Sequence, residues 1–155
     1  MTRWILPLVA LSAICAQTPK SADPRPPKTD IPYLKHAENL VETEAVEIKE
    51  EKQASDTLYT IAGESSPSKT PLPLPIFLLQ AEKIDPLRLQ MYRLTPAEGH
   101  RQITASGKKS ADPIHVSVVR VSPGLFRLEV SDSLDSGEYM LSVGGSNQAF
   151  CFGVR

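Results

Sequence analysis

The stretch DSLDSGEYMLSV, residues 132–143, joins a polar turn to an apolar segment. Aspartate, serine and glycine fill its first half, and these residue types favour tight turns because of their side-chain hydrogen bonds and backbone freedom. In its second half Tyr139 and Leu141 alternate with their neighbours, as in a strand that buries one face. We therefore predict structural roles for Asp135 and Gly137 in the turn and for Tyr139 at the start of the strand.

Similar segments recur along the C-terminal part of the chain. They are rich in valine, leucine and aromatic residues, and short turns such as Pro123-Gly124 separate them, as is typical of successive β-strands. This spacing predicts an all-β protein built as an antiparallel sandwich or barrel. The predicted strands are residues 76–80, 87–94, 100–106, 115–122, 125–131, 138–143 and 149–155.

Residues 37–53 are ambiguous between helix and strand. Their many glutamates and lysines favour a helix, but the apolar residues do not form a stripe at helical spacing. Several β-branched residues, among them Val46 and Ile48, suit a charged edge strand, which we favour slightly. Residues 33–63 are thus predicted to form a small N-terminal lobe with a strand or helix element.

Two proline-rich passages divide the chain. Residues 17–32 hold five prolines and few apolar residues, so they predict a flexible tether. Residues 64–75 predict an extended connector, because their prolines exclude a helix or a central strand. Residues 33–155 then form a single β-sandwich domain, with its main strands in residues 76–155.

The first sixteen residues have the features of a secretory signal. Arg3 precedes an apolar run that is too short to span a bilayer, and Ala16 is a small residue at the position where signal peptidase would cut. We predict cleavage after Ala16, a secreted or periplasmic protein, and no transmembrane span after cleavage. The alternatives are a lipidated Cys15, which its bulky neighbour Ile14 disfavours, and an uncleaved membrane anchor.

Charge and cysteine content exclude several classes of protein. Removal of residues 1–16 would leave 139 of the 155 residues and change the formal charge from −1 to −2, because Arg3 is lost. Such a balance offers no basic stripe for phosphates, so nucleic acid is not a predicted partner. Cys151 would have no intramolecular partner, and its apolar neighbours predict a small buried side chain.

No catalytic, cofactor-binding or metal-binding residues are predicted, and no cofactor is expected. The three histidines are far apart and lack the spacing of metal ligands, and no nucleophile or phosphate-binding motif occurs. The acidic residues Asp132, Asp135 and Glu138 suit calcium chemically, but they lack the pattern of a calcium loop. A turn explains them more simply than a metal site does.

The segment from Asp135 to Leu141 resembles the D-x-G-x-Y-x-C pattern of immunoglobulin-like strands. Leu141 stands where the cysteine would be, so the resemblance implies the sandwich architecture without its disulfide. The motif L-x-x-G-E-Y, from Leu134 to Tyr139, and the ending F-G-V at residues 152–154 resemble uncharacterised exported bacterial proteins. That resemblance implies an exported, immunoglobulin-like antiparallel β-sandwich of unknown function and brings no catalytic residues.

Taken together, these features predict a non-enzymatic exported module that binds another envelope or extracellular protein, or an envelope component, through a sheet edge or face. The alternatives are a hydrolase acting on cell-wall or carbohydrate substrates and a purely structural accessory domain. The sequence predicts no oligomeric state.

Overall fold

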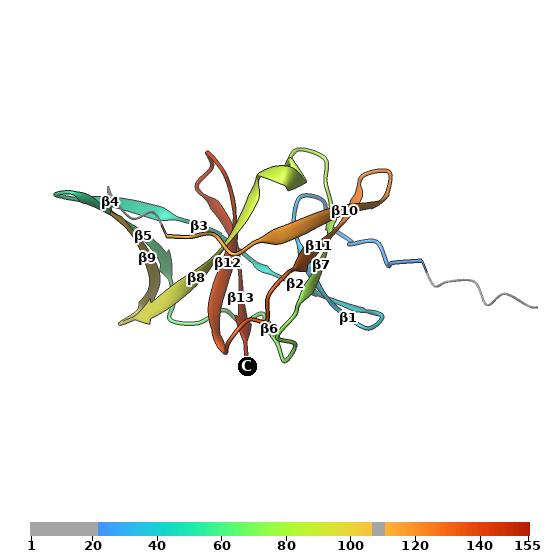
Figure 1. Cartoon of the computed structure of the whole chain (residues 1–155), viewed down its shortest axis with the longest axis horizontal. Coiled ribbons are helices and arrows are strands. Elements are labelled where there is room, and N and C mark those ends of the chain that lie inside the picture. The colour runs from blue at the N-terminus through green and yellow to red at the C-terminus, as the bar shows by residue number, and fades with distance from the viewer. Residues whose placement is uncertain (1–21, 107–110) are drawn as a thin grey trace, which may run out of the picture.

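The chain forms two β-sheets, as a computed structural model that describes residues 22–106 and 111–155 shows (Figure 1). The predicted signal segment, residues 1–16, and Cys15 lie outside the described residues. An all-β protein with two antiparallel sheets is therefore confirmed, and an immunoglobulin-like order of strands is not shown. The strands are β1 (Tyr33–His36), β2 (Asn39–Glu42), β3 (Glu44–Glu47), β4 (Lys49–Gln53), β5 (Asp56–Ala62), β6 (Lys69–Thr70), β7 (Ile76–Gln80), β8 (Leu89–Ala97), β9 (His100–Ser106), β10 (Val116–Ser122), β11 (Leu125–Val130), β12 (Gly137–Val143) and β13 (Gln148–Val154).

The first sheet has five strands in the order β10-β11-β7-β1-β2. The predicted strand at residues 76–80 is confirmed as β7, which pairs with β11 on one side and with β1 on the other. The hairpin between β10 and β11 turns at Gly124, whose φ of +74° is the left-handed conformation that a type II turn requires.

The second sheet curls into a half-barrel with the strand order β3-β13-β12-β8-β9-β5-β4, and β6 adds to β13 in parallel. Its first and last strands, β3 and β4, are consecutive in the chain and separated only by Ile48. The two end strands of this sheet are therefore joined by a single residue, so the sheet curls around an interior. Residues 39–53 contribute β2, β3 and β4, so the strand interpretation of this ambiguous segment is confirmed.

Two clusters of buried side chains hold these sheets together. The larger lies between the sheets, where the rings of Phe77 and Phe152 meet edge-on with centroids 5.0 Å apart. The smaller lies inside the half-barrel, around Met140 and Cys151. Alternate residues of β12 and β13 belong to different clusters, because successive side chains of a strand point to opposite faces. These two strands are therefore buried at nearly every position.

One row of side chains on the outer face of the five-stranded sheet is covered by another part of the chain. The register of β11, β7, β1 and β2 places Arg127, Leu78, Tyr33 and Glu42 side by side in this row. Leu78 is 0% and Tyr33 is 3% exposed, although neither belongs to the core between the sheets. A segment outside the sheets must exclude water from them.

That segment is residues 22–30, which we call the N-terminal strap. Its Asp23 lies 3.5 Å from the arginine at one end of the row, and its Lys28 lies 2.9 Å from the glutamate at the other end. Pro26, between them, is buried. Asp30 anchors the end of the strap by accepting three backbone N–H groups from the loop after β7. The described part of the predicted tether is thus held against the domain instead of extending freely from it.

The predicted connector, residues 64–75, also lies along the domain. β6 pairs with the end of β13, where the Gly153 N–H donates to the Ser68 carbonyl at 2.9 Å. Farther on, the Leu134 N–H donates to the Pro73 carbonyl at 2.7 Å. The strands within residues 33–63 pair in both sheets, so they are integrated with the main strands of the domain.

Leu87 differs from its prediction. It is the first residue of the predicted strand 87–94, but it lies outside the observed strand and is 78% exposed. The reason is local: Pro86–Arg88 form a 3-10 helix capped by the Asp85 side chain, so the strand begins only at Leu89.

The strap gives a direct prediction for stability. A chain that begins at residue 29 should be less stable than one that begins at residue 22 by about 2 kcal/mol, because Leu78 and Tyr33 lose their cover. Urea unfolding of the two chains measures this difference. Equal free energies of unfolding would mean that the strap does not contribute to burial of the row.

Candidate functional site

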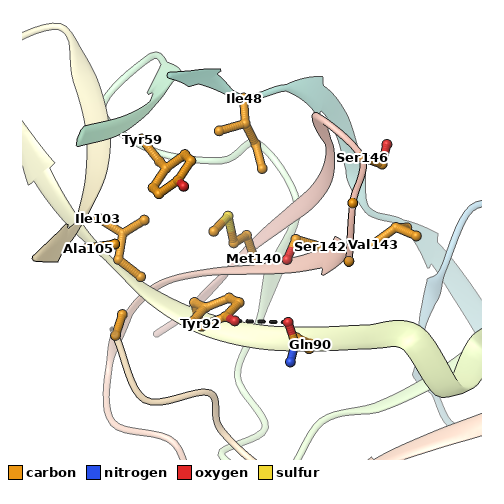
Figure 2. A pocket seen from close by; sticks show the side chains of 13 residues that line it. Ile48, Tyr59, Gln90, Tyr92, Ile103, Ala105, Met140, Ser142, Val143 and Ser146 are labelled. Atoms are coloured by element: carbon orange, nitrogen blue, oxygen red, sulfur yellow. Dashed lines mark hydrogen bonds between the residues drawn. The ribbon is translucent and has the colours of Figure 1, made fainter. Parts of the chain in front are cut away.

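β8 and β9 separate along the half-barrel. Within the described residues these strands pair at three positions next to their hairpin, from Thr95↔Gln102 to Ala97↔His100, and diverge beyond them. Beside this separation, where Ile114 instead pairs with β8 at Met91, lies a hollow of about 290 Å³. Figure 2 shows its walls: the hollow is lined chiefly by Ile48, Tyr59, Tyr92, Ile103, Ala105 and Met140, with Gln90, Ser142 and Ser146 at polar positions.

Among the described residues that line the hollow, none carries a charged side chain. Its polar groups are amide and hydroxyl groups, and the Tyr92 hydroxyl donates to Gln90 Oε1 at 3.0 Å. Burial raises the pKa of Tyr92 above its ordinary value, and the neighbouring Tyr59 raises it further. The phenol of Tyr92 therefore stays protonated at neutral pH, and the hollow is an uncharged, mainly apolar site.

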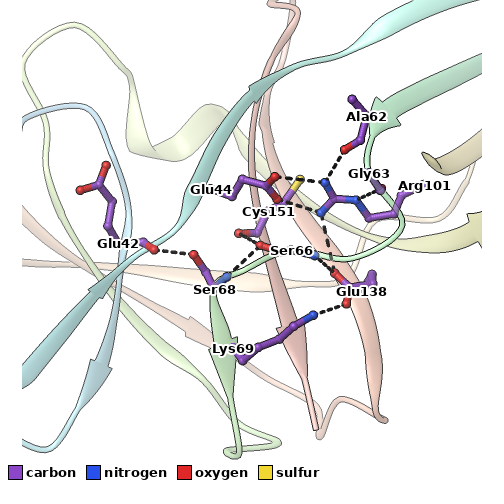
Figure 3. Close-up of polar contacts among 10 residues, drawn as sticks. All are labelled: Glu42, Glu44, Ala62, Gly63, Ser66, Ser68, Lys69, Arg101, Glu138 and Cys151. Carbon is purple, nitrogen blue, oxygen red and sulfur yellow. Dashed lines mark hydrogen bonds and ion pairs between the residues drawn. The ribbon is translucent and has the colours of Figure 1, made fainter. Parts of the chain in front are cut away.

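Arg101 closes the opposite end of the half-barrel interior (Figure 3). Its side chain is 0% exposed and forms a two-pronged ion pair with Glu44, at 2.9 and 3.3 Å. It also donates to the backbone carbonyls of Ala62 and Gly63, each at 2.8 Å. One guanidinium thus binds β3, the end of β5 and the loop that follows β5.

Glu138 extends this cluster to β12 and β6. Its carboxylate lies 3.8 Å from Arg101, accepts the Ser66 N–H at 2.8 Å and pairs with Lys69. Gly153 faces Glu138 in the β12–β13 register, and a Cβ there would stand only 2.6 Å from Lys69 Nζ. The two carboxylates and two cations balance in charge, which compensates for the removal of these groups from water.

Cys151 is buried beside this cluster, and its sequence-based prediction as a small buried side chain is confirmed. Burial raises the pKa of its thiol to about 12, against an opposing effect of Arg101. The thiolate needed for nucleophilic or redox chemistry is therefore not populated at neutral pH.

The predicted structural residues of the turn lie close together. The Tyr139 hydroxyl donates to the Asp135 carbonyl at 2.8 Å, which ties the start of β12 to the turn before it. The Asp135 side chain is exposed and lies 3.5 Å from Arg93, whose guanidinium also stands over the Tyr139 ring at 5.6 Å.

Gly137 has a different role from the one predicted. Positive φ angles occur at Gly63, Gly99, Gly124 and Gly145 among the described glycines, and Gly137 is not one of them. It is the first residue of β12, and a Cβ there would stand 3.1 Å from the Arg93 guanidinium. Its lack of a side chain makes room for Arg93, so backbone freedom is not what this position requires.

The edge of the five-stranded sheet at β10 is the second surface of interest. β10 pairs with β11 on one side and has no strand partner on the other within residues 22–106 and 111–155. Val119 and Val121 are 40% and 37% exposed, whereas Val116 and Val118 pack against the core. A β-bulge follows Arg120, so the regular part of the edge is the segment before it.

The other chemically interesting residues do not form a site. His36 lies in β1 and His100 in β9, in different sheets. In the described part of the chain, no group of three or more histidine, cysteine, aspartate or glutamate residues is placed to hold a metal ion. Likewise, no helix there has the length and apolar character needed to cross a membrane.

Comparison with known proteins gives no assignment: no protein family, no curated protein and no solved structure matches the chain. The resemblance to exported bacterial proteins therefore stays a prediction from the motifs alone. What the structure supports is the general class: the chain is an all-β protein with two antiparallel sheets.

Sequence reasoning missed both the hollow and the buried arginine. Arg101 alternates with Ile103 and Ala105 along β9, and this spacing of two would have placed its side chain on the same face as theirs. Glu138 alternates in the same way with Met140 and Ser142. The alternation was present in the sequence, but it gives no sign that a charge is buried, because arginine and glutamate are mostly exposed in proteins.

The hydroxyl of Tyr139 gives a stability prediction. Tyr139→Phe should lower the free energy of unfolding by about 1 kcal/mol, because the hydrogen bond to the Asp135 carbonyl is lost. The matched control is Tyr92→Phe, whose hydroxyl bonds to an exposed side chain and should matter less. Thermal unfolding of the two variants measures the difference. If Tyr139→Phe melts at the same temperature as the unaltered protein, the Tyr139 hydroxyl does not stabilise the start of β12.

Proposed function

We propose that this protein is a non-enzymatic binding module that engages another protein by strand addition at the edge of β10. The observation that supports it is a free edge strand, VSVVRVS, with apolar side chains exposed beside unpaired backbone. Such an edge is a template for an extended segment of another chain, because its N–H and C=O groups need partners.

Two other end strands, β4 and β2, are protected in ways that this edge is not. All five residues of β4 are exposed, and four of them are charged, which disfavours pairing with another strand. β2 at the far side of the five-stranded sheet ends in Glu42, which pairs with the strap. β10 carries one charge, Arg120, and three of its residues from Val119 onward are exposed.

The chemistry of the edge defines the partner. Val119 faces the same side as the cross-strand Arg127, and an added strand would place β-branched or other apolar side chains beside Val119. Arg120 makes no ion pair with a described residue, so an acidic side chain on the partner strand would complement it. The proposed partner segment is therefore extended, apolar on one face and acidic.

The signal features of the first sixteen residues support the further proposal that the protein acts after export, in the periplasm or outside the cell. A hydrolase has weaker support. None of the residues that line the hollow carries a carboxylate, an imidazole or a thiol, so the hollow provides no acid–base pair.

The test uses an array of eight-residue peptides that alternate valine or threonine with acidic, basic or neutral residues. We expect the protein to bind the acidic peptides preferentially. Val119→Glu should abolish this binding. The domain should stay folded, because the new carboxylate lies opposite Arg127 in the β10–β11 register.

Leu87→Glu is the matched control, since it also replaces an exposed apolar residue by a charge but lies in the 3-10 helix, away from the edge. This variant should bind the peptides normally. No peptide bound above background, or equal loss of binding in both variants, would contradict strand addition and favour the purely structural role.

A further inference from the structure

We propose that the hollow of the half-barrel binds a small neutral aromatic molecule that carries one hydrogen-bonding group, as phenols and indoles do. This site is separate from the β10 edge, because it lies in the other sheet and shares none of its lining residues with β10. Its ligand class follows from the size, the charge and the arrangement of the lining residues.

Size limits the ligand to about one ring system. At about 290 Å³ the hollow lies at the small end of the range of roughly 300–1,000 Å³ that is typical of ligand pockets. A single aromatic ring with a short substituent suits this volume, whereas a lipid chain or an oligosaccharide would extend far beyond it.

Charge excludes ionised ligands. The described lining residues provide no ion partner, and a charged group placed between Met140, Ile48 and Ile103 would lose its hydration without compensation from them. The polar positions instead suit one neutral donor or acceptor: the hydroxyl groups of Tyr59 and Ser142 and the Gln90 amide belong to residues that line the hollow.

The arrangement of the side chains favours a flat ring over an aliphatic group. Figure 2 shows the rings of Tyr59 and Tyr92 on different strands, with the Met140 side chain between them. Aromatic rings interact favourably with other rings edge-on or offset, and with a thioether sulfur near the ring edge. A bound ring would thus contact two tyrosines and one methionine, in addition to the aliphatic wall.

Strand pairing holds the walls of the hollow in place. β12 pairs with β8 and β13 along most of its length, so Met140 and Ser142 are held on a paired strand. β9 pairs with β5 along its whole length, which fixes Ile103 and Ala105 on the other wall. Paired strands therefore hold both of these walls of the hollow.

The test follows the methyl group of Met140 by NMR in protein labelled at its methionines. Met91, buried in the core between the sheets, provides an internal reference. We expect p-cresol and indole to shift the Met140 signal in a saturable way and to leave the Met91 signal in place. Benzoate, with the same ring and a charge, should cause no shift, and cyclohexanol, which is not aromatic, should bind more weakly than p-cresol.

Two matched variants locate the site. Ala105→Leu fills the hollow from its wall and should abolish the Met140 shift, whereas Ala97→Leu, on the neighbouring strand at the hairpin, should retain it. Val119→Glu should also retain it, because the β10 edge is separate from the hollow. Circular dichroism verifies that each variant is folded.

Several results would overturn the proposal. They are the absence of a saturable shift with both ring compounds, a shift with benzoate equal to that with p-cresol, binding of cyclohexanol as tight as that of p-cresol, and persistence of the shift in folded Ala105→Leu. If Ala105→Leu does not fold, the comparison of the four compounds on the unaltered protein still decides the outcome.

Discussion

The buried guanidinium of Arg101 determines how the half-barrel closes. It is fully buried, and it binds Glu44 together with the backbone carbonyls of Ala62 and Gly63, while Glu138 lies within ion-pair distance. A buried cation of this kind is tolerated only when its donors are satisfied and its charge is paired. β3, β5, β9 and β12 must therefore meet at this end of the interior, and this leaves the opposite end free to form the hollow.

Strands β12 and β13 make the two sheets depend on each other. β12 and β13 present alternate residues to two clusters, one between the sheets and one inside the half-barrel. A one-residue slip of β12 would exchange its two sets of side chains and place Glu138 in the apolar core. The ion pairs of Glu138 with Arg101 and Lys69 thus reinforce a register that the apolar residues alone also favour.

Local patterns predicted the strands well and the long-range structure poorly. Alternating apolar residues and turn residues indicated an all-β protein, the central position of β7 and the Gly124 turn, because these features depend on neighbours in sequence. The curling of the second sheet depends on β3 and β4 being consecutive, and the hollow depends on where β8 and β9 diverge. The strap was interpreted as a tether because proline-rich composition does not show which surface a segment covers.

Urea unfolding of Arg101→Met tests most directly whether the buried guanidinium holds the half-barrel together. We expect a loss of about 3 kcal/mol, because the partly buried Glu44 would lose its ion pair and Glu138 would keep only Lys69 as a cationic partner. Arg93→Met, the control at a half-exposed ion pair, should change stability by no more than about 1 kcal/mol. Adding Glu44→Gln and Glu138→Gln to Arg101→Met should recover part of the loss, and an Arg101→Met variant as stable as Arg93→Met would contradict the role of Arg101.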